Sequence, residues 1–174
     1  MREERKKRKR RGFTLVEMLA VMLILAVLAG ATWYLYTNYI QGARATKIMD
    51  EVKSLTSALN LFEQQTGYMP DAIQELWKND DGSGNPIPGW SGPYIQPPAG
   101  DTTATSLKSG TGATITLSCD STDGEQIVYT GVPKSVAKDY DSQVDDGNLS
   151  TGFVTYDEST NTLKITVRKS ASCI

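Results

Sequence analysis

Histidine is absent from the 174-residue sequence, and cysteine occurs only twice. The chain therefore lacks the side chain that acts most often as a general base or a metal ligand. No Cys-x-x-Cys pair is present, so nothing indicates a dithiol redox centre. Paired carboxylates can hydrolyse glycosides, but no substrate cleft or second catalytic motif accompanies them here. These absences lead us to expect a protein that is not an enzyme.

Charged side chains are absent from Met18 to Ala43, and no proline occurs before Pro70. These 26 uncharged residues exceed the roughly 20 that a helix needs to cross a bilayer core of about 30 Å. A strongly basic tail, residues 1–11, precedes them. Since basic flanking segments stay on the cytoplasmic side, we expect one membrane-spanning helix with the rest of the chain outside the cytoplasm.

Aromatic residues gather near the far end of the uncharged run, where interfacial aromatics belong. They are Trp33, Tyr34, Tyr36 and Tyr39. A secretory signal cleaved at Ala29-Gly30-Ala31 and a plain single-span anchor would both explain the basic and apolar segments. Neither explains Glu17, whose carboxylate stands where the uncharged run begins and is costly near hydrocarbon.

Residues 12–17 read Gly-Phe-Thr-Leu-Val-Glu, between the basic tail and the apolar run. This arrangement resembles the processing site of type IV prepilins and of the related type II secretion pseudopilins. The resemblance implies that a prepilin peptidase cuts between Gly12 and Phe13 and methylates the new amino group of Phe13. It also implies that Glu17 meets the free amino terminus of a neighbouring subunit during assembly.

On this resemblance, the chain is a structural subunit of a type IV pilus, a filament that serves adhesion, motility or DNA uptake. A type II secretion pseudopilin is the alternative, and a membrane-anchored binding protein that never assembles is a second. The implied partners are other pilin subunits, the prepilin peptidase, an inner-membrane assembly platform and, before assembly, membrane lipid. The subunit would span the inner membrane once and then join an extracellular or periplasmic filament.

One position departs from the family pattern. Many pilins carry a helix-breaking proline at the position of Tyr34, and this chain does not. If the helix loosens in a filament, Gly30 is the expected place, because glycine is the weakest helix former in the span.

Removal of residues 1–12 would change the charge balance. The leader holds eight basic and two acidic residues, so the mature chain would have 10 basic and 18 acidic residues, a net charge of −8. An acidic chain disfavours nonspecific binding to nucleic acid. We therefore interpret the basic tail as a topogenic signal and expect no nucleic-acid binding by the subunit itself.

The helical pattern continues beyond the uncharged run. Apolar residues recur at spacings of four, three, four and three: Ile48, Val52, Leu55, Leu59 and Phe62. This stripe predicts a helix whose apolar face packs on a sheet, and Gly67 and Pro70 mark its end. A helix from Phe13 to Thr66 would be roughly 80 Å long. Its first half, 13–40, would be membrane anchor and filament core, and 41–66 its soluble half.

Residues 67–174 are expected to form a globular head. Alternating side chains predict strands at 113–118, 126–130, 153–157 and 163–168, with a short helix at 134–144. The predicted fold class is α+β, with the long helix packed on an antiparallel sheet of about four strands. The type IV pilin resemblance implies the same fold.

The start of the head has several turn signals. We expect Asp71 to cap a short helix, 72–78, and residues 79–92 and 96–111 to form loops. The stretch from Trp90 to Tyr94 is similar to the Trp-x-Gly-Pro-Tyr segment of the major pseudopilin. These two aromatic residues are expected to hold the loop on the sheet.

The two cysteines, Cys119 and Cys173, are both in the head. Because the head is expected outside the cytoplasm, we expect them to form a disulfide. This bond would resemble the C-terminal disulfide loop of many type IV pilins. A loop of about 55 residues would contribute roughly 4 kcal/mol in the loop-entropy account. Two free thiols are the alternative.

An acidic segment of the head offers oxygen ligands at short spacing: Asp141, Asp145, Asp146 and Asn148. Such ligands can hold Ca²⁺, and major pseudopilins bind calcium, which makes calcium the one candidate cofactor. The spacing does not match an EF-hand loop. A solvated turn around Gly147, with side chains bonding local amides, is the alternative explanation.

Overall fold

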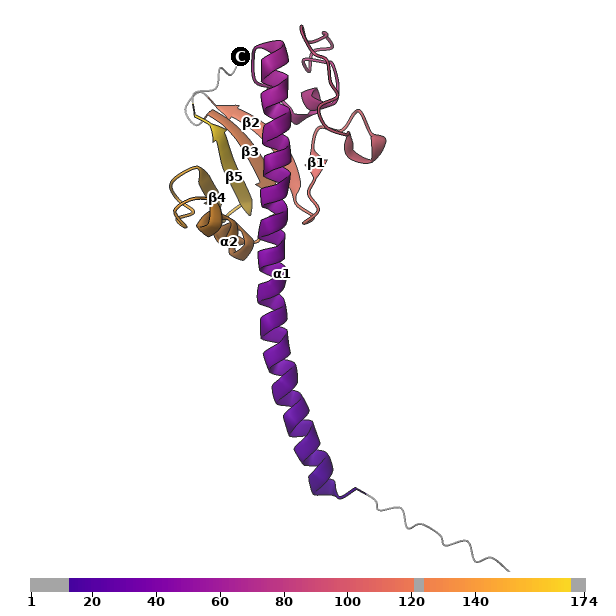
Figure 1. Cartoon of the computed structure of the whole chain (residues 1–174), viewed down its shortest axis with the longest axis vertical. Coiled ribbons are helices and arrows are strands. Elements are labelled where there is room, and N and C mark those ends of the chain that lie inside the picture. The colour runs from indigo at the N-terminus through magenta and orange to yellow at the C-terminus, as the bar shows by residue number, and fades with distance from the viewer. Residues whose placement is uncertain (1–12, 121–123, 170–174) are drawn as a thin grey trace, which may run out of the picture. The chain divides into compact units, whose positions relative to one another are not determined.

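The structure, a computed structural model, describes residues 13–120 and 124–169 (Figure 1). Two compact units divide the chain between Tyr39 and Ile40. The basic leader, Gly12 and Cys173 lie outside the described residues. Helix α1, Leu15–Thr66, contributes its first part to the N-terminal unit and its remainder to the C-terminal unit.

Helix α1 can form over this length because residues 15–66 contain no proline and only two glycines, the two residue types with the lowest helix propensity. It begins at Leu15, two residues later than the sequence predicts, because Thr14 precedes the helix and serves as its cap. It ends at Thr66, as predicted. Gly67 follows with a positive φ of 85°, a left-handed conformation that glycine adopts without steric cost.

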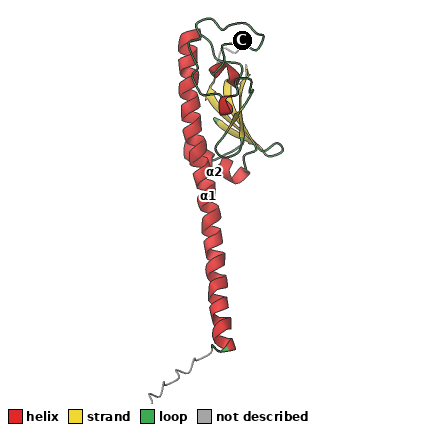
Figure 2. Cartoon of the chain, turned by 90° about the vertical axis from the view of Figure 1, so that its right-hand side faces the viewer, coloured by secondary structure: helices red, strands yellow, loops and turns green. Residues whose placement is uncertain are grey.

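The second part of α1 supplies one wall of the core of the C-terminal unit. Four residues of the predicted stripe are buried: Ile48, Leu55, Leu59 and Phe62. Val52 is only partly buried and lies at the margin of the core. The strands lie on one side of this part of the helix (Figure 2). The predicted packing of a long helix on an antiparallel sheet is confirmed.

The sheet has five antiparallel strands rather than about four. Their order is β1-β2-β3-β5-β4. The bounds are β1 Leu107–Lys108, β2 Thr114–Asp120, β3 Gly124–Thr130, β4 Val154–Asp157 and β5 Thr162–Arg168. The additional strand, β1, lies in the segment that composition assigned to a loop, and it pairs through Leu107 with Ile115 of β2. The other four strands match the predicted ones within two residues at each end.

Helix α2, Lys134–Val144, connects β3 to the β4–β5 hairpin, as predicted. Its buried face consists of Val136, Ala137, Tyr140 and Asp141. Three of these residues are expected on such a face, whereas a buried aspartate is not. This residue, Asp141, is one of the candidate oxygen ligands named from the sequence.

The helix predicted at 72–78 is shorter than expected. It is a single 3-10 turn, η1 Ile73–Leu76, and Asp71 does not cap it. Glu75 instead folds back and accepts a hydrogen bond from the backbone N of Ala72 at 3.0 Å. The inward positions of Ile73, Leu76 and Trp77 are as predicted, because all three are buried. A second 3-10 turn, η2 Pro98–Gly100, lies in the following segment.

Trp90 and Tyr94 hold their loop against helix α1 and turn η1. The indole Nε1 of Trp90 donates to the backbone O of Glu75 at 2.8 Å. The ring of Tyr94 meets that of Phe62 edge-on with centroids 5.5 Å apart, and its hydroxyl donates to Gln65 at 2.5 Å. The two aromatic residues thus hold the loop, as predicted, and these contacts are with α1 and η1.

Candidate functional site

The first turn of α1 carries Thr14 and Glu17 in a reciprocal arrangement. Glu17 Oε2 accepts hydrogen bonds from the backbone N of Thr14 at 2.9 Å and from its hydroxyl at 3.0 Å. The backbone N of Glu17 donates to Thr14 Oγ1 at 3.3 Å. This is a capping box, which gives partners to donors that a helix start would otherwise leave unbonded. The Thr-Leu-Val-Glu sequence therefore starts the helix as well as presenting a carboxylate.

Only one of the two carboxylate oxygens of Glu17 takes part in this cap. Oε2 takes both hydrogen bonds from Thr14, and Oε1 has no hydrogen bond within the described residues. No basic side chain of residues 13–120 or 124–169 forms an ion pair with Glu17, and the residue is exposed. This carboxylate oxygen, at the start of an apolar helix, thus has no partner among the described residues.

The N-terminal unit exposes large apolar side chains along the whole length of its helix. Phe13 is 78 % exposed, and Leu15, Met22 and Val27 are each more than 70 % exposed. The most apolar window of α1 has a mean hydropathy of 2.4 and no buried residue. Among the described residues, α1 is the one helix long and apolar enough to cross a membrane. Such a surface requires lipid or protein to cover it.

Two threonines of this helix form hydrogen bonds to the helix itself. The hydroxyl of Thr32 donates to the backbone O of Leu28 at 2.8 Å, and that of Thr37 donates to Tyr34 O at 2.9 Å. Hydroxyl groups bonded in this way can enter hydrocarbon without leaving a donor unpaired. The predicted aromatic residues, including Trp33 and Tyr39, are exposed as an interfacial position requires.

Two predicted features involve residues outside the described part of the chain. Phe13 is described, but Gly12 on the other side of the predicted cleavage point is not. Cys119 lies on β2 opposite Glu125 of β3, whereas Cys173 is outside the described residues. Cleavage, methylation of Phe13 and the disulfide remain predictions.

The predicted acidic cluster converges at the C-terminal end of α2. Asp141, Asp145 and Asp146 each place a carboxylate oxygen so that the three atoms lie within 4.8 Å of one another. Asp145 Oδ2 accepts from the backbone N of Phe153 at 2.5 Å and of Val154 at 3.2 Å. These bonds fold the loop after α2 around the aspartates and bring the three side chains together.

Asp141 is the unusual member of this cluster. Its side chain is completely buried, and neither of its oxygens has a hydrogen-bond partner in the described chain. Burial raises the pKa of Asp141, and the charges of Asp145 and Asp146 add to the rise. Asn148, the fourth predicted ligand, uses its Oδ1 to accept from Ser150 N at 3.2 Å. Asn148 thus bonds a local amide, as the turn alternative describes, whereas Asp141 bonds none among the described residues.

Two further buried carboxylates, on Glu75 and Glu125, were missed by the sequence analysis. Glu75 is 4 % exposed and Glu125 is fully buried. Burial raises the pKa of Glu75 to about 7 and that of Glu125 to about 8, with Asp71 contributing to both. The available signal was strand periodicity, since Glu125 shares its parity with the buried Ile127 and Tyr129.

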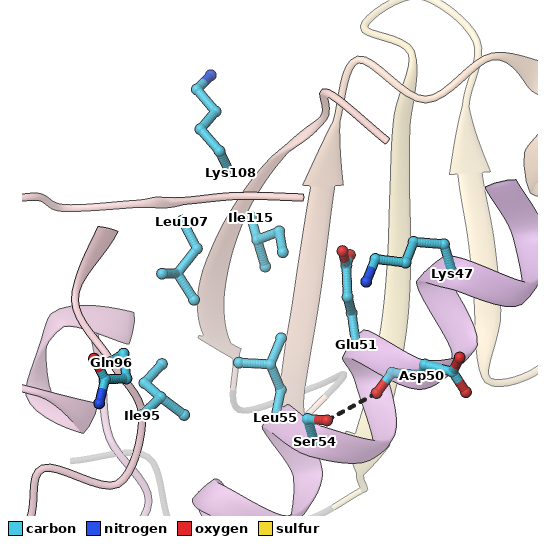
Figure 3. Close-up of a pocket in the computed structure, with 10 residues that line it drawn as sticks. All are labelled: Lys47, Asp50, Glu51, Ser54, Leu55, Ile95, Gln96, Leu107, Lys108 and Ile115. Carbon is cyan, nitrogen blue, oxygen red and sulfur yellow. Dashed lines mark hydrogen bonds between the residues drawn. The ribbon is translucent and has the colours of Figure 1, made fainter. Parts of the chain in front are cut away.

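A pocket of about 260 Å³ lies between α1, β1 and β2 (Figure 3). Its polar lining includes Lys47, Glu51 and Lys108. Glu51 Oε2 accepts from the Ser109 hydroxyl at 2.7 Å, and Oε1 accepts from Gly110 N at 2.8 Å. Both oxygens therefore serve structural hydrogen bonds, and the pocket offers no pair of unoccupied carboxylates for acid–base chemistry.

Comparison with known families identifies a motif in the N-terminal part of the chain. Residues 7–33 match the prokaryotic N-terminal methylation motif. The chain carries a prepilin-type leader motif. This motif is the hallmark of type IV pilin and pseudopilin precursors, and it includes Phe13 and Glu17 within its span. No curated protein sequence and no solved structure matches the chain.

The prepilin motif and the apolar helix α1 are both features of a pilin-like precursor. The motif implies processing by a peptidase and assembly into filaments in general terms. The apolar helix behind it fits a membrane-anchored pilin precursor. The α+β unit that follows has its own core, which includes residues 45–62 of α1.

Proposed function

We propose that this protein is a structural subunit of a type IV pilus, with no catalytic activity of its own. The observation that carries the proposal is the methylation motif at residues 7–33, together with helix α1, which begins within the motif and whose apolar window has no buried residue. In the precursor, lipid covers this surface. In the filament, the corresponding helices of neighbouring subunits cover it, and close packing between them provides cohesion.

Glu17 is proposed to set the register between subunits. Cleavage after Gly12 would create an amino group on Phe13, next to the turn that presents Glu17, whose Oε1 has no hydrogen bond from the described residues. An unpaired carboxylate is unfavourable in an apolar filament core, and so is an unpaired amine. Pairing the Phe13 amine of one subunit with Glu17 of the next removes both penalties at once.

The other proposed partners follow from this life cycle. The prepilin peptidase recognises the leader, and an inner-membrane assembly platform adds the processed subunit to the filament. The head, residues 67–174, would stay outside the cytoplasm and cover the outside of the filament. Adhesion, motility or DNA uptake would be properties of the assembled pilus.

A pair of variants at Glu17 tests the assembly role. Glu17→Gln keeps an oxygen that can accept from Thr14, so it retains the capping box but loses the charge. Glu17→Ala loses both. We expect both variants to be cleaved, yet to yield at least tenfold fewer filaments than the wild type. Filaments are sheared from cells and quantified by immunoblot against total subunit.

The two variants separate charge pairing from helix capping. Normal filament yield from Glu17→Gln, with loss in Glu17→Ala, would assign the residue to capping alone. Normal yield from both would contradict the proposal. Tyr39→Phe serves as a control, because it changes an exposed polar group of the same helix without touching the first turn.

A type II secretion pseudopilin is the second candidate function. The fixed loop at Trp90 and Tyr94 favours it, because that segment is similar to one in the major pseudopilin. Deletion of the gene distinguishes the two candidates. Loss of surface filaments indicates a pilus, whereas normal filaments with loss of exported proteins indicate a secretion system. A membrane-anchored binding protein would instead keep its leader and stay monomeric.

A further inference from the structure

One asparagine of the chain is followed two residues later by a serine. The sequence contains six asparagines, and only Asn148, in Asn148-Leu149-Ser150, has serine or threonine at this spacing. With a residue other than proline between them, this is the acceptor pattern of N-linked glycosylation. We propose that Asn148 carries an N-linked glycan. The inference rests on the proposed placement of the head outside the cytoplasm.

The acceptor pattern lies on the surface of the head, in the loop between α2 and β4 (Figure 1). Asn148 and Ser150 are exposed, whereas Leu149 between them is partly buried and packs against the core. A glycan is bulky and solvated, so its acceptor must be on the surface. Leu149 holds the loop in place while the two residues that define the pattern face solvent.

Local hydrogen bonds fix the conformation of this loop. The backbone N of Asn148 donates to Asp146 Oδ1 at 2.8 Å, and the backbone O of Asn148 accepts from Thr151 N at 3.0 Å. The side-chain Oδ1 of Asn148 accepts from Ser150 N at 3.2 Å, which forms an Asx-turn. The asparagine side chain is thus positioned beside the serine that completes the acceptor pattern.

This arrangement leaves the acceptor atom free. Only Oδ1 of the Asn148 side chain takes part in the turn, and Nδ2 forms no hydrogen bond with residues 13–120 or 124–169. The hydroxyl of Ser150 likewise has no partner within those two ranges. Attachment of a sugar to Nδ2 would therefore break no hydrogen bond that the described structure contains.

The transfer forms one bond and breaks one. The donor is a lipid-linked oligosaccharide diphosphate, and its transferase is supplied by the cell. Asn148 Nδ2 bonds to the anomeric carbon of the first sugar as the bond from that carbon to the diphosphate oxygen breaks. The lipid diphosphate leaves with the electron pair, and one Nδ2 proton passes to a base of the transferase. Nothing is oxidised or reduced, and the amide keeps one N–H.

A hollow of about 220 Å³ adjoins the acceptor and offers room for the first sugar. All three residues of the acceptor pattern line it, together with Lys138 and Tyr156. The exposed Lys138 forms no ion pair in the described part of the chain. Its ammonium group can donate to sugar hydroxyls. The hydroxyl of Tyr156 donates to Val132 O at 2.8 Å, which fixes this side of the hollow.

The glycan would also cover apolar surface at this corner of the head. Val144 at the end of α2 is 50 % exposed, and Phe153 before β4 is 52 % exposed. These two residues lie at the two ends of the loop that carries Asn148. A bulky, solvated group on the loop would shield them and oppose association through this corner.

The test uses the protein from its own cell envelope, digested with trypsin and analysed by mass spectrometry. Asn148 lies in the peptide Asp139–Lys164. We expect this peptide to carry an added mass equal to a sum of monosaccharide residues. Electron-transfer fragmentation, which preserves the sugar bond, should place the added mass on Asn148. In the same digest, the peptide that begins at Phe13 reports leader processing separately.

Four variants at exposed positions make the result specific. Asn148→Gln and Ser150→Ala should lose the added mass, because each removes one required member of the acceptor pattern. Ser150→Thr keeps the pattern and should retain the glycan. Thr151→Ala is the matched control, because it removes the adjacent hydroxyl outside the pattern and should also retain it. Since Asn148→Gln would carry no sugar, its intact mass reports the processed polypeptide alone.

The outcomes separate this inference from the proposed function. An uncut leader with a glycan on Asn148 would support the inference and contradict the pilus proposal. A cut leader with an unmodified Asn148 would overturn the inference alone. A sugar on Ser150 or Thr151 in place of Asn148, or an added mass that persists in Asn148→Gln, would overturn it as well.

Discussion

Glu125 is a carboxylate enclosed in the head without any hydrogen bond to either oxygen from the described residues. Its pKa of about 8 arises first from burial and then from the nearby charges of Asp71 and Glu75. Glu75, with a pKa of about 7, shares this environment but accepts a hydrogen bond from Ala72. Both side chains should therefore be protonated in the folded protein at slightly acidic pH.

This environment makes the stability of the head depend on pH. In the unfolded chain both groups lose their protons near the ordinary glutamate pKa of about 4.3. Between that pH and about 8 the folded state binds more protons, so the free energy of unfolding falls as the pH rises. Each group contributes a slope of about 1.4 kcal/mol per pH unit within its window. Denaturant melts from pH 5 to 9 measure the effect.

Glu125→Gln provides the matched variant, because it keeps the shape and removes the titration. We expect a shallower pH dependence than in the wild type and greater stability at pH 9. Glu75 would continue to supply the remaining slope. A pH dependence unchanged by the substitution would show that Glu125 is not the titrating group.

At the scale of single residues, sequence reasoning succeeds where local spacing defines the chemistry. The motif predicts Glu17 as a carboxylate available to a neighbouring subunit, and the residue is exposed. The cap by Thr14 was not predicted, although its spacing of three residues from Glu17 is that of a capping box. Asp141 and Glu125 are different, because their importance comes from burial. Neither position can be recognised as unpartnered until α2 and β3 are packed into the core.

Strand β1 illustrates the element scale. It consists of only Leu107 and Lys108, in a segment of low apolar content. A strand this short is formed by its surroundings, because Leu107 pairs with Ile115 and Glu51 of α1 binds the turn that follows. Glu51 reaches that turn across 58 residues of sequence, and no local pattern reveals such a contact.

Glu51→Ala tests this attachment. The substitution leaves the Ser109 hydroxyl and Gly110 N without their acceptor, and we expect a loss of about 1–3 kcal/mol in the free energy of unfolding. Asp50→Ala changes the exposed neighbour on the same helix and should cost no more than about 0.5 kcal/mol. Urea unfolding of both variants measures the difference. Equal losses would mean that Glu51 does not hold the turn.

Elements with strong periodicity were predicted closely, and elements fixed by distant contacts were not. Helix α2 has its predicted bounds, and α1 differs by two residues at its start. The turn at Ile73–Leu76 is shorter than expected because the Glu75 side chain closes it. The loop at Trp90 contacts α1 and η1. Its contact with α1 depends on the positions of Phe62 and Gln65, which lie far from the loop in the sequence.

At the scale of the whole molecule, the chain contains two units with opposite surface requirements. The N-terminal unit exposes its apolar side chains, whereas the C-terminal unit buries its own apolar core. In the proposed life cycle, a membrane and then a filament would cover the apolar side chains of the first unit. The methylation motif at residues 7–33 supports this proposal.

The central claim is that the chain is processed as a prepilin, and the intact mass of the protein from its own cell envelope tests it most directly. We predict the mass of Phe13–Ile174 plus one methyl group, increased by two hydrogens on reduction if Cys119 and Cys173 are paired. A mass beginning at Met1 would indicate an unprocessed membrane anchor, and one beginning at Thr32 would indicate an ordinary secreted protein. Either result would contradict the account.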